Sequence, residues 1–147
     1  MSFFKSINVS ATGLTAERLR MDIISKNIAN ANTTRTASGS PYRRQVPVFR
    51  EQDPKNSFEN ALAQAQGKYV GGNGVEVATI EDDTRPFKKV YNPGHPDADE
   101  EGYVSMPNVE VVTEMINLIT SSRGYEANVT SLNNSKQMLM KALEIGK

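Results

Sequence analysis

The sequence predicts a mainly α protein with a small β-containing middle, in which long N- and C-terminal helices pair as a coiled-coil-like assembly domain. Three observations lead to this fold class. All seven prolines lie between Pro41 and Pro107, and a proline inside a helix costs about 3 kcal/mol. Apolar residues recur at heptad spacing in both proline-free ends. Only 37% of the 147 residues are hydrophobic, so a large self-contained core is not expected.

The first segment, residues 1–34, is expected to form an N-terminal assembly helix. Its apolar side chains recur every seven residues, which is the spacing of an amphipathic helix that buries one face. The members of this stripe are Ile7, Leu14, Met21 and Ile28. Because isolated helices are marginal in water, this stripe needs a partner.

Asparagines gather at the end of this segment, at Asn27, Asn30 and Asn32, and another lies in the C-terminal segment at Asn128. Asparagine is a poor residue for a helix interior because its side chain competes for backbone hydrogen bonds. Two interpretations remain open. The amides cap the end of the helix, or they form hydrogen bonds between neighbouring helices and fix their register.

The middle segment, residues 35–107, is expected to be a loop-rich module with short strands. Clusters of Gly, Pro and Asn mark its turns. Extended runs are predicted at residues 45–49, 75–80 and 87–91, the first at a sheet edge because it contains Pro47. Residues 58–66 are expected to form one short helix. With few apolar residues, this module is expected to borrow burial from the helices or to become ordered against a partner.

The third segment, residues 108–147, is expected to form a C-terminal assembly helix over about 108–145. Asn108 is predicted to cap its start, and Gly146 to end it. Eight of the ten residues at heptad positions are apolar, which is typical of a coiled-coil seam. The ten positions are Val111, Met115, Leu118, Ser122, Tyr125, Val129, Leu132, Lys136, Leu139 and Leu143. This helix pairs most simply with residues 1–34, and the alternative is pairing with other chains.

The composition argues against several functions. There is no Cys, and Lys+Arg and Asp+Glu number 17 each, so thiolate metal sites and a field that attracts nucleic acid are not expected. The single His, His95, adjoins an acidic cluster at residues 97–101, for which a solvated turn is preferred to a divalent metal site. No stretch approaches the roughly 20 apolar residues of a membrane span. No catalytic residue, cofactor, metal, nucleic-acid partner or direct membrane insertion is therefore expected.

Several runs resemble a known family. Residues 27–33 (NIANANT) resemble the N-terminal signature of the bacterial flagellar rod and hook proteins, and residues 122–128 (SRGYEAN) resemble their C-terminal motif, from which Gly124 is a departure. Within that family, residues 90–96 (VYNPGHP) and 102–109 (GYVSMPNV) are similar to a proximal-rod member. Residues 53–69 match no such pattern.

The resemblance implies a structural subunit of the proximal rod of the flagellar basal body. Such a subunit transmits torque and lines the export channel with its terminal helices. It is exported by the flagellar type III apparatus without a cleaved signal peptide, and its partners are the export apparatus, other rod proteins and copies of itself. The expected assembly residues are Ile7, Leu14, Met21, Asn27, Ile28, Asn30, Asn32, Val111, Leu118, Arg123, Tyr125, Asn128, Val129, Leu132, Leu139 and Leu143. The alternative is a cytosolic coiled-coil adaptor that dimerises through its C-terminal helix.

Overall fold

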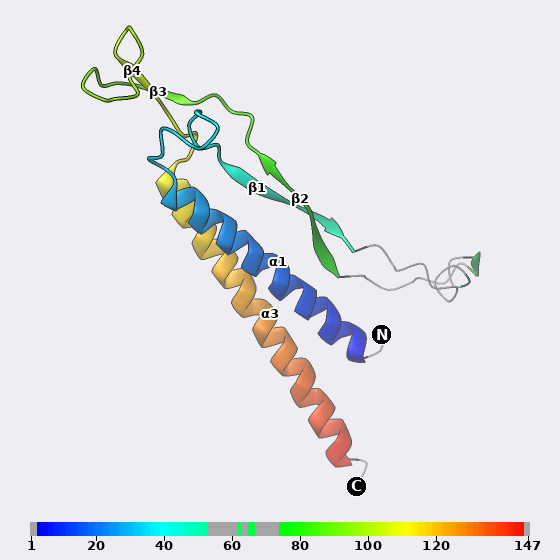
Figure 1. Ribbon diagram of the computed structural model, residues 1–147. Coiled ribbons are helices and arrows are strands. Elements are labelled where there is room, and N and C mark those ends of the chain that lie inside the picture. Colours follow the sequence, from blue (N-terminus) through cyan, green and yellow to red (C-terminus); the bar gives the residue numbers. More distant parts are fainter. Residues whose placement is uncertain (1–2, 53–61, 63–64, 67–73, 146–147) are drawn as a thin grey trace. The chain divides into compact units, whose positions relative to one another are not determined.

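The structure, a computed structural model, describes residues 3–52, 62, 65–66 and 74–145 (Figure 1). Its elements are, in chain order, α1 (Phe3–Ala29), β1 (Gln45–Glu51), β2 (Val75–Asp82), β3 (Lys88–Tyr91), β4 (Tyr103–Met106) and α3 (Val111–Ile145). The strands form two small sheets, β1 with β2 and β3 with β4. Two terminal helices and a small β-containing middle are thus confirmed.

Helix α1 ends close to the position that its asparagines predict. The backbone N–H of Asn30 donates to the carbonyl oxygen of Lys26 at 3.1 Å, and the Asn30 side-chain amide donates to the same oxygen at 2.9 Å. Asn30 therefore gives this carbonyl, one of the last of the helix, a second donor beside its backbone N–H. This geometry agrees with the capping interpretation for Asn30.

Helix α3 begins at Val111, and the expectation that Asn108 caps it is wrong. The Asn108 side-chain oxygen accepts the backbone N–H of Arg44 at 2.9 Å, and its amide donates to the carbonyl oxygens of Asp83 and Arg85, each at 3.1 Å. Asn108 is 6% exposed. It satisfies the backbone of two distant loops, because buried backbone groups need a partner. Gly146, the expected end of the helix, lies outside the described residues.

The predicted extended runs correspond to β1, β2 and β3. Strand β1, which contains Pro47, belongs to a two-stranded sheet, so it lies at an edge as expected. The short helix predicted at residues 58–66 falls almost wholly outside the described residues. Strand β4 was not predicted, and it pairs antiparallel with β3 in the register Lys88↔Met106 to Tyr91↔Tyr103.

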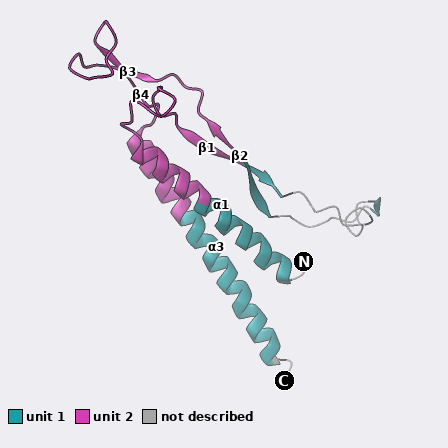
Figure 2. Cartoon of the chain, viewed as in Figure 1, with its two compact units in different colours: residues 1–18, 49–78, 123–147 teal, residues 19–48, 79–122 magenta. Residues whose placement is uncertain are grey.

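The chain divides into two compact units, coloured separately in Figure 2. Unit 1 comprises residues 1–18, 49–78 and 123–147, and unit 2 comprises residues 19–48 and 79–122. Each unit therefore includes a stretch of α1 and a stretch of α3. The division of the chain into segments 1–34, 35–107 and 108–147 stays a prediction.

Few apolar residues are buried in the part of the chain that the structure describes, as the low hydrophobic fraction predicts. In unit 2, Ala31, Tyr42 and Val109 form one cluster, with Val111 packed against it. The other buried hydrophobic residues are Ala16, Ile23, Ile24 and Val104. Several buried positions are instead polar, and these organise the candidate site.

Candidate functional site

In unit 1, α1 and α3 meet through small and polar residues. The hydroxyl of Ser10 donates to that of Ser131 at 3.4 Å. A Cβ atom added at Gly13 would lie 3.0 Å from the Asn128 Oδ1 atom, and one added at Gly124 would lie 3.4 Å from the Glu17 carboxyl carbon. The contacting pairs are thus Ser10 with Ser131, Gly13 with Asn128, and Glu17 with Gly124. Because the residue number falls along α3 as it rises along α1, the two helices run antiparallel along this line of contacts, which we call the seam.

This seam differs from the apolar one that the heptads predict. Its α1 members are Ser10, Gly13 and Glu17, and its α3 members are Gly124, Asn128 and Ser131. Most of the apolar heptad residues of both helices are only half-buried, and Met115 and Leu143 are 50% and 64% exposed. The coiled-coil-like pairing through apolar heptads is therefore not confirmed.

The apolar heptads of unit 1 lie beside the seam. Leu14 follows Gly13, Tyr125 follows Gly124 and Leu132 follows Ser131 in the sequence. A helix turns by about 100° per residue. When two antiparallel helices face each other, the residue that follows a seam residue therefore lies on the same side of the helix pair in both helices. Ile7 and Leu139 lie one heptad further along. We call these five residues, Ile7, Leu14, Tyr125, Leu132 and Leu139, the helix-pair flank.

The residue before Gly13 turns the other way, toward β2. The hydroxyl oxygen of Thr12 accepts the backbone N–H of Val75 at 3.1 Å. A Cβ atom at Gly74 would overlap the Thr12 side chain, so only glycine permits this approach. The strand therefore lies on the face of α1 away from the flank.

In unit 2, a polar cluster joins the two helices to the strands. Asn27 is fully buried. Its amide group donates to the Gln45 carbonyl oxygen at 2.8 Å and to the Glu114 Oε2 atom at 3.1 Å. Its Oδ1 atom accepts the Tyr42 hydroxyl at 2.9 Å and the Gln45 backbone N–H at 3.0 Å. All four hydrogen-bonding sites of the Asn27 side chain are thus used.

Glu114, on the first turns of α3, is 1% exposed. Its Oε1 atom accepts the Nε and Nη2 hydrogens of Arg44 at 3.0 and 2.8 Å, and the Asn117 amide at 3.3 Å. Arg44 also donates from Nη1 to the Asp83 Oδ2 atom at 3.2 Å. A buried carboxylate needs this paired charge, because burying it alone is costly.

Two pKa shifts follow from this cluster. The hydrogen bond from the Arg85 side chain is the main reason that the pKa of Asp83 lies far below its ordinary range, with a further contribution from Arg44. Burial raises the pKa of Tyr42, and the charges of Asp82 and Glu114 add to this rise. The Tyr42 hydroxyl therefore stays protonated and can donate to Asn27.

Asp83 is expected to make the free energy of unfolding depend on pH at the acidic end. Since the pKa of Asp83 is lower in the folded chain than its ordinary value of 3.8, its stabilising contribution is present above that value and disappears as pH falls through the folded pKa. Asp83→Asn is expected to lower the free energy of unfolding by about 1.5 kcal/mol at neutral pH, at the low end for charged hydrogen bonds, because Arg85 is largely exposed. Urea unfolding from pH 6 to pH 2 measures this.

The matched control for that series is Asp22→Asn on the exposed face of α1. The difference in free energy between the unsubstituted chain and Asp83→Asn should shrink as the pH falls. A difference that stayed constant over this range would contradict the role of the ionised carboxylate.

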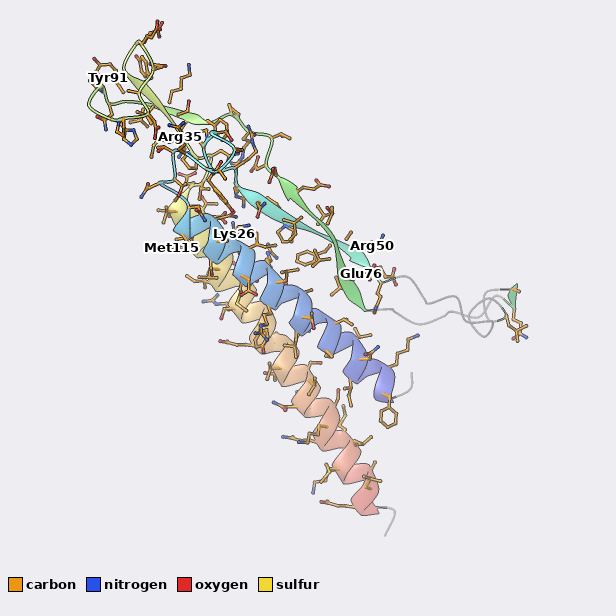
Figure 3. All side chains as sticks on the ribbon, viewed as in Figure 1. Lys26, Arg35, Arg50, Glu76, Tyr91 and Met115 are labelled. Carbon is orange, nitrogen blue, oxygen red and sulfur yellow. The ribbon has the colours of Figure 1, made fainter. Side chains whose placement is uncertain are left out.

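Large apolar side chains remain on the surface of the described chain. Four of them lie together on α3: Val112 (67% exposed), Met115 (50%), Ile116 (59%) and Ile119 (55%). Met115 is labelled in Figure 3. Phe4, Met138, Met140 and Leu143 are also more than half exposed. Exposed apolar groups of this kind mark interaction surfaces.

The structure brings only some of the expected assembly residues together. Asn27 reaches α3 through Glu114, whereas the Asn30 side chain bonds to Lys26 and Thr33 at the end of α1. The Asn128 amide donates to the Gly124 carbonyl oxygen of its own helix at 2.9 Å. Asn32 and Arg123 are exposed, and Leu143 is 64% exposed.

The remaining expected members are half-buried, each within its own unit. They are Met21, Ile28, Val111 and Leu118 in unit 2, and Val129 beside the flank in unit 1.

Sequence reasoning missed the polar residues that join the elements, chiefly Arg44, Tyr42 and Glu114. One signal was present in the sequence. Buried polar residues recur on α3 at seven-residue spacing, at Glu114, Ser121 and Ser135, with half-buried Asn128 in the same series. A polar heptad beside an apolar one indicates two different contacts of the same helix.

Among the residues that the structure describes, no group of three or more His, Asp or Glu side chains lies close enough to hold a metal ion. His95 Nδ1 lies 3.9 Å from the Asp97 Oδ2 atom, and it accepts the Asp97 backbone N–H. No described helix is long and apolar enough to cross a membrane.

Known families match both ends of the chain. Residues 7–35 match the family model described as flagella basal body rod protein. Residues 100–145 match the model of the C-terminal part of the flagellar basal body rod FlgEFG proteins. The two matched ranges contain most of α1 and all of β4 and α3.

Three relatives that match along the whole length of the chain carry the name flagellar basal-body rod protein FlgC. The protein from Bacillus subtilis is 49% identical, over all of this chain and all of its own length. That from Borreliella burgdorferi is 48% identical, over 99% of this chain and 98% of its own. That from Escherichia coli O157:H7 is 38% identical, over 99% of both. The name of these relatives describes a component of the flagellar rod.

Proposed function

The chain belongs to the FlgC family of flagellar basal-body rod proteins and is a structural subunit of that rod, and we propose that its terminal helices form the surface by which it assembles. The observation that carries the proposal is the helix-pair flank. The chain closes its own helix seam with small polar residues, which leaves both apolar stripes half-exposed. Half-exposed apolar stripes are stabilised when a neighbouring subunit covers them.

The proposed assembly residues fall into two groups. The apolar group packs against neighbours and consists of Ile7, Leu14, Met21, Ile28, Val111, Leu118, Tyr125, Val129, Leu132, Leu139 and Leu143. The polar group forms hydrogen bonds that set register and consists of Asn27, Asn30, Asn32, Arg123 and Asn128. In this proposal, Asn27 acts within the chain through Glu114, and the exposed Arg123 acts toward a neighbour.

The flagellar basal body is the site of action, and other rod proteins are the first expected neighbours. We further propose contacts with copies of this chain and with the export apparatus, and export without a cleaved signal peptide. Packed terminal helices would line the export channel and transmit torque. Relatives that match along the whole chain favour this function over a cytosolic adaptor.

Leu132→Asp is expected to block incorporation into the rod while export continues. Leu132 lies at the middle of the flank, and a carboxylate there would have to lose its water when a neighbour packs against it, which costs several kcal/mol. The variant is made in a bacterium that lacks its own copy. Incorporation into rods should fall at least about tenfold, because a loss of about 1.4 kcal/mol already lowers a binding constant by that factor. Swimming should fall with it, and the secreted chain should accumulate in the medium.

Asn134→Asp is the matched control, since it adds the same charge to an exposed position two residues along α3. It should leave swimming unchanged. Circular dichroism of both purified variants checks that the helices remain. Normal rods built from Leu132→Asp would refute the assignment of the flank.

A further inference from the structure

The single histidine of the chain, His95, lies in the loop between β3 and β4, residues 92–102, which we call the β3–β4 loop. Its side chain is 29% exposed. Its Nδ1 atom accepts the backbone N–H of Asp97 at 3.1 Å. Because Pro96 has no backbone N–H, the N–H of Asp97 is the first backbone donor that follows His95. The imidazole therefore holds the backbone of its own loop.

This hydrogen bond requires one protonation state of the imidazole. A backbone N–H can only donate, so Nδ1 must offer its lone pair, as it does in the neutral ring that carries its proton on Nε2. A protonated imidazole has a hydrogen on both nitrogens and cannot accept the bond. Histidine is the side chain that changes its charge between pH 5 and 8, so the bond depends on pH in that range.

Asp97 connects the β3–β4 loop to the segment that follows α1, and both belong to unit 2. Its Oδ2 atom accepts the hydroxyl of Thr34, a half-buried residue, at 2.8 Å. Its Oδ1 atom lies 3.7 Å from the Nη1 atom of Arg35 (Figure 3). The Arg35 side chain is 72% exposed, so this ion pair contributes little. The hydrogen bond from Thr34, which we call the loop latch, is the stronger of the two contacts.

The charged groups near His95 come from two segments. On its own loop are Asp97 and the acidic residues 99–101, all three of which are exposed. The segment after α1 contributes Arg35, which pairs with Asp97. The Asp97 Oδ2 atom lies 3.9 Å from the His95 Nδ1 atom. A protonated ring thus has an acceptor within reach, and it is the same oxygen that holds Thr34.

We propose that protonation of His95 opens the loop latch and so releases the β3–β4 loop from the segment that follows α1. The neutral ring accepts the Asp97 N–H and leaves the carboxylate to Thr34. The protonated ring faces that N–H as donor to donor, so it turns to the carboxylate. A charge-assisted hydrogen bond is stronger than one from a neutral hydroxyl, so Asp97 exchanges Thr34 for His95 as its partner.

The hydrogen bonds that shape the β3–β4 loop do not involve the imidazole. The backbone N–H of Asn92 donates to the Gly102 carbonyl oxygen, and that of Asp99 donates to the Tyr103 carbonyl oxygen, each at 2.9 Å. Protonation therefore changes how the loop is held without unfolding β3 and β4. The latch is also independent of the proposed assembly surface, because none of its residues belongs to the helix-pair flank.

NMR spectroscopy of the full chain between pH 8 and pH 5 tests the latch, since carboxylates stay ionised over most of this range. Exchange of the Asp97 backbone amide with water is measured relative to an unstructured peptide at the same pH. It should become about fivefold faster as the His95 ring takes up its proton, the factor that one ordinary hydrogen bond contributes. The Thr34 amide resonance should shift with the same midpoint as the ring protons of His95.

Three substitutions provide matched controls. His95→Asn offers an amide oxygen in place of Nδ1, so it should keep the Asp97 amide protected at every pH. His95→Ala has no acceptor, and its Asp97 amide should exchange at pH 8 as fast as that of the unsubstituted chain at pH 5. Asp97→Asn removes the charge that attracts the protonated ring. In that variant the Thr34 resonance should stop following the ring, while the amide of residue 97 still does.

Two outcomes would overturn the proposal. Exchange of the Asp97 amide that stays constant while the His95 ring titrates would mean that the imidazole does not hold the loop. A Thr34 shift that persists in His95→Asn would mean that carboxylates, and not the imidazole, control the latch. Both measurements are made on unassembled chains, so a failure of the latch leaves the proposed function untouched, and normal swimming of Leu132→Asp leaves the latch untouched.

Discussion

Arg44→Met is expected to lower the free energy of unfolding by about 3–5 kcal/mol, because it leaves a buried carboxylate without its partner charge. Arg44 holds the Oε1 atom of Glu114 with two hydrogen bonds, at 3.0 and 2.8 Å. Glu114 is 1% exposed, so water cannot replace the guanidinium. Urea unfolding followed by circular dichroism measures the loss. Hydrogen exchange should place the lost protection in unit 2, at residues 45–48 of β1 and at the start of α3.

A solvent-exposed ion pair between an arginine and a glutamate provides the control. Arg50 on β1 donates from Nε to the Glu76 Oε1 atom on β2 at 2.6 Å (Figure 3), but its side chain is 57% exposed. Arg50→Met should therefore change the free energy of unfolding by less than about 1 kcal/mol, as exposed ion pairs do. Equal losses from the two substitutions would contradict the special position of Glu114.

A second variant separates lost charge from lost packing. In the Arg44→Met background, Glu114→Gln removes the buried charge while it keeps an amide that can still bond to Asn27. It should recover part of the stability, because a neutral amide costs less to bury than an unpaired carboxylate. No recovery would mean that Arg44 acts through the packing of its side chain.

Gly13→Leu is expected to separate α1 from α3 in unit 1. A single Cβ atom at this position would already approach the Asn128 Oδ1 atom to 3.0 Å and its Cγ atom to 3.1 Å. Asn128 cannot turn away freely, because its amide donates to the Gly124 carbonyl oxygen at 2.9 Å. Forcing extra atoms into a packed contact costs roughly 1–3 kcal/mol, although leucine is a better helix former than glycine by under about 1 kcal/mol. Hydrogen exchange measures the separation, and the backbone amides of residues 124–131 are expected to exchange faster than in the unsubstituted chain.

The compensating variant is Gly13→Leu with Asn128→Ala. Removing the amide makes room opposite residue 13, so the double variant should regain most of the protection of α3. The control is Thr15→Leu, which places the same side chain at an exposed position of α1 and should have little effect. A tolerated Gly13→Leu would show that the two helices do not approach closely in solution.

Much of the fold follows from the sequence. Proline excluded long helices from the middle and left the ends free, and this correctly predicted α1 and α3. Alternating residues near Val75 and around Pro47 correctly predicted β2 and β1. These signals are local, because backbone restrictions and side-chain alternation act within a few residues.

Strand β4 and the buried cluster were not predicted, because both depend on partners far along the chain. Asn108 shows the difficulty. Its position before a helix is typical of a cap, but Arg44, Asp83 and Arg85 compete for its side chain and win. Local sequence cannot rank such distant partners.

The candidate site, like the fold, was predicted only in part from the sequence. The apolar heptads determined which residues of each helix form stripes, and the sequence motifs determined the family to which the chain belongs. Only the tertiary structure decided that the chain closes its own helix seam through Ser10, Gly13, Asn128 and Ser131. The physical reason is that a hydrophobic pattern states which face gains from burial without naming the surface that covers it, whereas small side chains allow two backbones to approach. The apolar stripes thereby stay largely half-exposed, and we propose that neighbouring subunits cover them.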